Sequence, residues 1–301
     1  MQQILSQISL SGHDLTTMGL DLFLGLFILV LMRWAYSLWV RIDFREELAR
    51  KDNFALGISI AGALLSIAML ITAVVSSFTM MAYQQMAIKL ISYGLVGILL
   101  IKVGRVAHDR LVLSRFNKHD QIMQGNISIA FVDAAGAIAM ALIVSSVLRW
   151  TRSIDINGLI AIASGFVVAL TMILLTTRAV EHHYAANNQN DDMQDALVRG
   201  QFALAVRHAG QILGVSIAVS AGEHIIQYQP QAYVNNLLSW LLVAVALTLL
   251  SVVLTLIAKR IVLFGINLVR EVDHQHNVGI ASIEMILSIG MAMLLRGVVS
   301  V

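Results

Sequence analysis

Eight long apolar runs constrain this chain more than any other feature of its sequence. Each is close to the roughly 20 apolar residues that a helix needs to cross a bilayer, and they cover residues 15–40, 53–78, 86–106, 126–148, 156–177, 201–222, 232–258 and 277–299. Only 13% of the residues are charged, against roughly 25% in soluble domains. We therefore expect an all-α, polytopic membrane bundle of eight transmembrane helices, in contact with the lipid bilayer.

The distribution of Lys and Arg predicts how the bundle lies in the membrane. Basic residues are retained on the cytoplasmic side, and 14 of the 20 fall in loops after odd-numbered runs, against four in the other loops. Residues 1–15 contain no Lys or Arg, so they do not resemble a cleaved signal peptide. We expect both termini on the non-cytoplasmic side. The net charge of +2 is explained by this bias, so no nucleic-acid partner is expected.

A short motif opens four of the runs. A side-chain amide is followed by small residues at the second and fourth positions after it, and the amides are Asn53, Asn126, Gln201 and Asn277. They lie 73, 75 and 76 residues apart, which indicates internal repeats. Because each half contains an even number of helices, the two repeats are parallel. We expect a four-helix repeat at 1–150 and another at 151–301, in a pseudo-two-fold or pseudo-four-fold arrangement, with Asn53 equivalent to Gln201 and Asn126 to Asn277.

Small residues on the motif helices predict where these helices pack. Positions 0, +4, +7 and +8 from each amide share one helix face, and small residues let helix backbones approach closely in lipid. The expected packing seam consists of Gly57, Ala61, Ala130, Ala134, Ala205, Ala209 and Ala281. The amides themselves are expected to cap the free N–H groups at the four helix starts.

Ionisable residues near the seventh position after the amide form the candidate polar site. Three of the four equivalent positions hold Asp133, His208 and Glu284, and Arg207 directly precedes His208. A charge at a helix centre costs roughly 2.5–3.5 kcal/mol on insertion scales, so such residues mark a functional site by default. Position +7 lies only about 10 Å along the helix from its start, which places the site in the cytoplasmic third.

Two interpretations of this site stay open. In the first, Asp133 or Glu284 pairs with Arg207 and locks the packing of the motif helices. In the second, Asp133, His208 and Glu284 line a polar cavity that passes protons, cations or a small solute. Arg207 is the only basic residue at that depth on a motif helix, so one carboxylate should be left neutral, hydrated or ion-bound.

The sequence does not support enzyme activity. It contains no Gly-x-Ser-x-Gly elbow, P-loop or dinucleotide glycine run, and it has no Cys. Loop histidines occur beside Glu181 and Asp273, but without metalloprotease-type spacing. We expect no catalytic residue, no cofactor and no metal site.

The amide-x-small-x-small helix start, placed after a charged loop within four-helix units, resembles the YjfL-type family of bacterial inner-membrane proteins (domain of unknown function 350), here in two tandem copies. The resemblance covers residues 15–150 and 155–300, and Gln201 departs from its Asn. It implies a bacterial inner (plasma) membrane location and no established activity. Some relatives are encoded near phage-shock-like coat proteins and ATP-grasp ligases, which suggests envelope maintenance.

Two function classes follow from these features. The first is a channel- or transporter-like protein whose polar site is formed by Asp133, Arg207, His208 and Glu284. The alternative is a non-conducting scaffold whose basic cytoplasmic segments, 102–116 and 259–272, recruit a peripheral envelope-stress partner or anionic lipid. A water-accessible cavity at the site would favour transport, and closed ion pairs would favour the scaffold. In either class we expect a homo-oligomer that associates through Gly/Ala-rich faces.

The orientation can be tested with reporter fusions. Fusions at Lys118 and Asn188 should report the cytoplasm, and a fusion at Gln229 should report the opposite side, because loop Lys and Arg are retained inside. A cytoplasmic signal from Gln229 would reverse the orientation and the depth assigned to the polar site.

Overall fold

The computed structural model describes residues 12–40, 43, 45–77, 83–152 and 155–301, and all regular elements in these ranges are helical. The eight long helices are α2 (Gly12–Val40), α3 (Phe54–Ser77), α4 (Tyr83–Ala107), α6 (Ile127–Thr151), α7 (Ile156–Asn187), α9 (Phe202–Ser220), α11 (Tyr233–Val262) and α12 (Val278–Val299). Each belongs to a segment that is long and apolar enough to cross a membrane. The predicted all-α bundle of eight helices is confirmed.

Short helical turns complete the bundle. One precedes each motif helix, namely η1 (Arg45–Arg50), α5 (Lys118–Met123), α8 (Met193–Val198) and η3 (Arg270–His274). The turn η2 (His108–Val112) continues α4, and α10 (Gly222–Ile225) follows α9. The turn before each motif helix is therefore part of the repeat.

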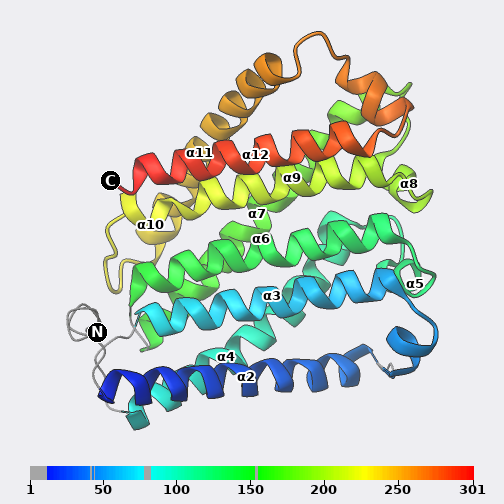
Figure 1. Ribbon diagram of the computed structural model, residues 1–301. Coiled ribbons are helices and arrows are strands. Elements are labelled where there is room, and N and C mark those ends of the chain that lie inside the picture. The colour runs from blue at the N-terminus through cyan, green and yellow to red at the C-terminus, as the bar shows by residue number, and fades with distance from the viewer. Residues whose placement is uncertain (1–11, 41–42, 44, 78–82, 153–154) are drawn as a thin grey trace, which may run out of the picture.

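The four motif helices form one row in the order α3, α6, α9 and α12, and all four begin at the same end of the bundle (Figure 1). Helices α4, α7 and α11 pack across the row, while α2 packs against α3 and α4. The common direction agrees with the predicted parallel repeats. Because α3 and α12 lie at opposite edges, the row is open and does not close into a four-fold ring.

Backbone contacts of the same kind occur in both halves. Gly62 of α3 lies against Ala134 of α6, and Gly210 of α9 lies against Met285 of α12, so closely that a Cβ at either glycine would overlap the facing backbone. The two glycines are each nine residues after their motif amide, and the two facing residues are each eight after theirs. The same two positions, +9 on one helix and +8 on the next, therefore make the close backbone contact in each half.

The packing seam differs from the expected one at one position. Ala130, Ala134, Ala205, Ala209 and Ala281 are buried and Gly57 is half-buried, whereas Ala61 is exposed. The reason is that position +8 faces the preceding motif helix and position +9 faces the following one. As α3 is first in the row, its +8 residue has no such neighbour, and the contact is made by Gly62.

The close contacts predict which glycines are essential for packing. Gly62→Ala and Gly210→Ala should each lower the free energy of unfolding by about 1–3 kcal/mol, because the added methyl group forces apart two backbones. The measurement is thermal or denaturant unfolding in detergent micelles. Gly290→Ala in α12 is the matched control, since its methyl group would enter open space. Equal stability of all three variants would contradict the packing described here.

Candidate functional site

The motif amides connect each repeat unit to the next. Asn53, Asn126 and Asn277 each cap their own helix, because Oδ1 accepts a hydrogen bond from the backbone N–H three residues later, at 3.0, 3.2 and 3.1 Å. The Nδ2 of Asn53 donates to the carbonyls of Ile122 and Met123 at the end of α5. The Nδ2 of Asn126 donates in the same way to Leu197 and Val198 at the end of α8.

The third junction uses an ion pair in place of the amide. Gln201 makes no side-chain cap, and its Oε1 has no hydrogen-bond partner among the described residues. Arg207 of α9 instead reaches η3, where its Nη2 lies 2.5 Å from Oδ1 of Asp273. Asp273 is four residues before Asn277, just as Ile122 is four before Asn126. Asp273 therefore occupies the turn position that supplies a hydrogen-bonded carbonyl at the other two junctions. At this junction the Arg207–Asp273 ion pair replaces the amide contact.

Asp133 lies in the contact between α3 and α6, where it is 2% exposed. Its Oδ1 is 2.5 Å from Nζ of Lys118, and its Oδ2 accepts a 2.6 Å hydrogen bond from Ser59 of α3. Lys118 also pairs with Asp109 of η2, whose side chain is 38% exposed. The side chains of Asp109, Lys118 and Asp133 therefore lead from the surface of the protein to its interior. Arg207, expected to pair with either Asp133 or Glu284, is not the partner of Asp133.

Glu284 occupies the equivalent position in the second half and is 3% exposed. Lys259 of α11 donates to its Oε1 at 2.7 Å. Its Oε2 is buried and has no hydrogen-bond partner in the part of the chain that the structure describes. A half-satisfied buried carboxylate needs an explanation such as a proton, a water or an ion. Arg207 is not the partner here either, since both carboxylates have lysines of their own.

His208 lies on α9 against α7 and is fully buried. Its Nε2 is 3.4 Å from Oγ1 of Thr177, and Nδ1 has no hydrogen-bond partner among the described residues. Asp133, His208 and Glu284 therefore lie in separate helix contacts and do not line one shared cavity. The sequence places Lys118 and Asp273 in cytoplasmic loops and Lys259 at the start of the basic segment 259–272, and it predicts none of them as a partner of the polar site. Their one sequence signal was proximity to a motif helix or to the end of a long run.

A polar pocket of about 310 Å³ opens at the end of the bundle where the motif helices begin. Its lining consists of Tyr184, Asn187, Asn188, Gln189, Asp191, Gln201, Asp273, His274 and His276. The pocket thus contacts Asp273, the partner of the buried Arg207. Among the described residues, no group of three His, Asp or Glu side chains could hold a metal ion.

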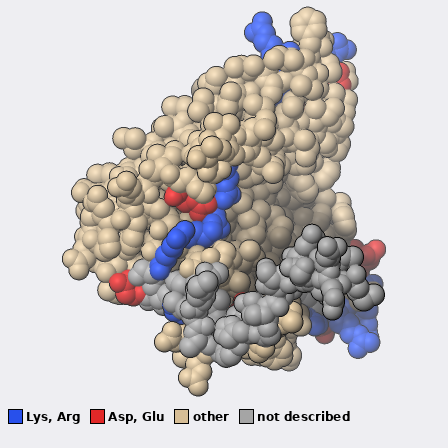
Figure 2. All heavy atoms as spheres, turned by 60° about the vertical axis from the view of Figure 1, so that its left-hand side comes forward, with Lys and Arg blue, Asp and Glu red and all other residues tan. Residues whose placement is uncertain are grey.

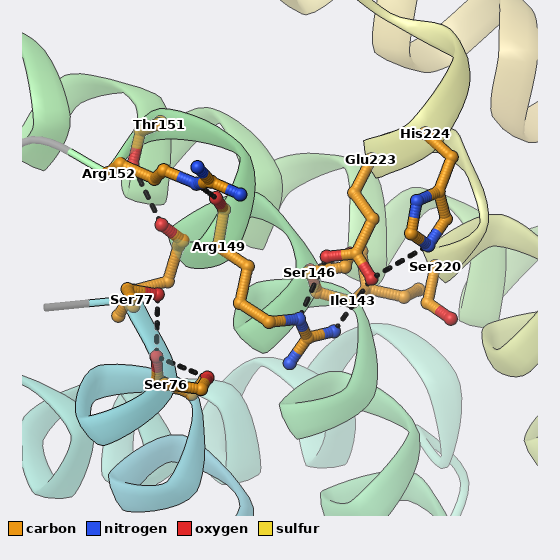
Figure 3. A network of polar contacts seen from close by, with 12 residues as sticks. Ser76, Ser77, Ile143, Ser146, Arg149, Thr151, Arg152, Ser220, Glu223 and His224 are labelled. Carbon is orange, nitrogen blue, oxygen red and sulfur yellow. Dashed lines mark hydrogen bonds and ion pairs between the residues drawn. The ribbon is translucent and has the colours of Figure 1, made fainter. Parts of the chain in front are cut away.

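A second charged cluster, absent from the sequence interpretation, lies at the opposite end. There Glu223 of α10 pairs with Arg149 at the end of α6 and lies beside His224 (Figure 3). Arg296 at the end of α12 pairs with the same carboxylate. The four candidate site residues belong to the motif-start end, so the bundle has a charged region at each end.

Comparison with known proteins gives one match. The family model described as Domain of Unknown Function (DUF350) matches the chain twice, over residues 9–148 and 153–299. Each matched range contains four of the long helices, which agrees with the two tandem units predicted from the sequence. No curated protein and no solved structure matches the chain.

The buried pairs lead to a stability prediction. Lys118→Met should lower the free energy of unfolding by about 3–5 kcal/mol, because it leaves the buried Asp133 carboxylate without its cation. Adding Asp133→Leu should restore much of that loss, since neither charge then remains. Unfolding in detergent micelles measures both effects.

The matched control is Arg50→Met, which breaks the exposed Arg50–Glu46 pair of η1. Exposed pairs contribute about 1 kcal/mol or less, so this variant should be nearly neutral. If Lys118→Met were no less stable than Arg50→Met, the Lys118–Asp133 pair would not hold the two helices together.

Proposed function

The chain belongs to the DUF350 family, and we propose that it is an ion-handling protein of the channel or transporter type. Its eight apolar helices make it a multi-pass membrane protein. We place it in the bacterial inner membrane with both termini outside the cytoplasm, which puts the start of each motif helix on the cytoplasmic side. This orientation rests on the distribution of loop Lys and Arg.

The observation that carries the proposal is that buried ionisable groups in both halves connect with the same end of the bundle. In the first half, the partly exposed Asp109 and the buried Asp133 share Lys118. In the second half, the polar pocket is lined in part by Asp273, whose fully buried side chain pairs with Arg207. Ionisable residues at membrane depth that connect to water are typical of ion and proton pathways.

The proposed chemistry is exchange at the two carboxylates. A proton or small cation that enters beside Asp109 competes with the Lys118 ammonium for Asp133, and Lys118 then remains paired with Asp109. At Glu284, Lys259 occupies one oxygen, while Oε2 is left to accept a proton or a cation. Uptake at Asp133 cancels the excess negative charge that two carboxylates and one ammonium leave. Uptake at Glu284 adds a positive charge to a balanced pair, so a proton has to leave Lys259 to keep this buried site neutral.

A second candidate function is a non-conducting scaffold, and the closed form of the ion pairs favours it. Both carboxylates are at most 3% exposed and each bridges two elements, as a packing lock would. In this alternative the basic residues at the motif-start end attract anionic lipid or a peripheral envelope-stress protein. Homo-oligomer formation remains a prediction for either function.

Flux measurements on protein reconstituted in liposomes separate the two functions. Under a pH or cation gradient, wild-type protein should conduct, and Asp133→Asn and Glu284→Gln should each lose most of the flux because the exchanging carboxylate is gone. Glu46→Gln is the control, since this carboxylate of η1 is exposed and should leave the flux unchanged. If wild-type protein passes no ion under any gradient, and the two interior substitutions change only thermal stability, the scaffold function stands.

A further inference from the structure

The charged cluster at the end opposite the motif starts is built around one carboxylate. Arg149 donates from Nε and Nη2 to Glu223 at 2.9 and 3.0 Å, and Arg296 donates from Nη2 to the same side chain at 2.8 Å. Figure 3 shows Arg149 and Glu223 pointing toward one another, with His224 beside the carboxylate. Three separate elements, α6, α10 and α12, are joined at this point.

The charges in this cluster do not balance. Glu223 is nearly buried, whereas the two Arg side chains are 30% and 31% exposed. Among the side chains that the structure describes, Glu223 is the only carboxylate paired with Arg149 or Arg296. Two guanidinium groups therefore share one negative charge, and N–H groups of both remain for a further acceptor. A second anion would complete the site.

The surroundings of the cluster indicate the kind of anion. Figure 2 turns this end of the bundle forward and shows basic and acidic side chains gathered in a hollow of a mostly uncharged surface. Large apolar side chains near the cluster in the sequence are exposed. Ile225 is two residues after Glu223, Met293 is three residues before Arg296, and Val298 is two residues after Arg296. A ligand that fits here carries a negative group that binds in the hollow, and apolar chains that contact the exposed apolar side chains around it.

We propose that Arg149 and Arg296 bind the phosphate group of an anionic phospholipid, with Glu223 holding the two guanidinium groups in position. Arginine offers paired N–H donors that match phosphate oxygens, and it is more weakly hydrated than lysine. The acyl chains would lie against the exposed apolar face of α12. Free phosphate has the same charged group as the lipid headgroup, but it has no acyl chains to bind the apolar face of α12. The proposal is independent of ion transport at the other end.

The test uses purified full-length protein in a nonionic detergent and measures thermal unfolding against added phosphatidylglycerol, diacylglycerol or inorganic phosphate. Phosphatidylglycerol should stabilise the wild-type protein, and the other two should not at the same concentration. Arg149→Gln and Arg296→Gln should each weaken phosphatidylglycerol binding about tenfold or more, because each removes a charge-assisted hydrogen bond. Arg260→Gln, an exposed Arg at the far end of α11, is the control and should bind like wild type.

A further variant keeps the test decisive if the Arg substitutions fold poorly. Glu223→Gln keeps a side-chain oxygen that can accept from the guanidinium groups and hold them in position, but it removes the negative charge that competes for them. It should therefore bind phosphatidylglycerol at least as tightly as wild type and depend more on it for stability. Unchanged binding in the Arg variants, or lost binding in Glu223→Gln, would overturn the proposal. A response to inorganic phosphate equal to that for phosphatidylglycerol would show an anion site that does not recognise lipid.

Discussion

Hydrocarbon gives two transmembrane helices no hydrophobic reason to associate, so this bundle depends on close backbone contact between its motif helices. Gly62 against Ala134 and Gly210 against Met285 supply that contact in the two halves. The amides of Asn53 and Asn126 add hydrogen bonds from each helix start to the turn of the next unit. Together these interactions fix the spacing and the register of the row.

The position of the ionisable groups follows from that register. Position +7 lies directly before the +8 residue that touches the preceding helix, so Asp133 and Glu284 are carried into the interhelical contacts by the packing itself. Their lysines come from different elements, Lys118 from a short turn and Lys259 from a long helix. The two halves therefore share the carboxylate position and differ in how its charge is compensated.

The sequence alone predicted the features that depend on local pattern. Apolar length identified eight helices, the spacing of the amides identified the repeats, and the even number of helices in each half made the repeats parallel. All three depend only on the order of residues along the chain and not on how the segments fold together. The partners of the charges were missed, since the reach of Lys118 or Lys259 depends on how a turn and a distant helix fold back on the row. The assignment of Ala61 to the seam was wrong for a related reason. The sequence does not tell which edge of the row a helix occupies.

All four motif helices begin at one end, so their backbone dipoles point the same way. Each helix carries about half a positive charge at its N-terminus and half a negative charge at its C-terminus, which gives the row about two charges at either end. In the orientation that the loop residues predict, the positive ends face the cytoplasm, the negative side of an energised membrane. The other four long helices, α2, α4, α7 and α11, run the opposite way, so their dipoles offset this charge separation across the bundle as a whole. The positive ends of the row therefore act locally, on groups next to the motif starts.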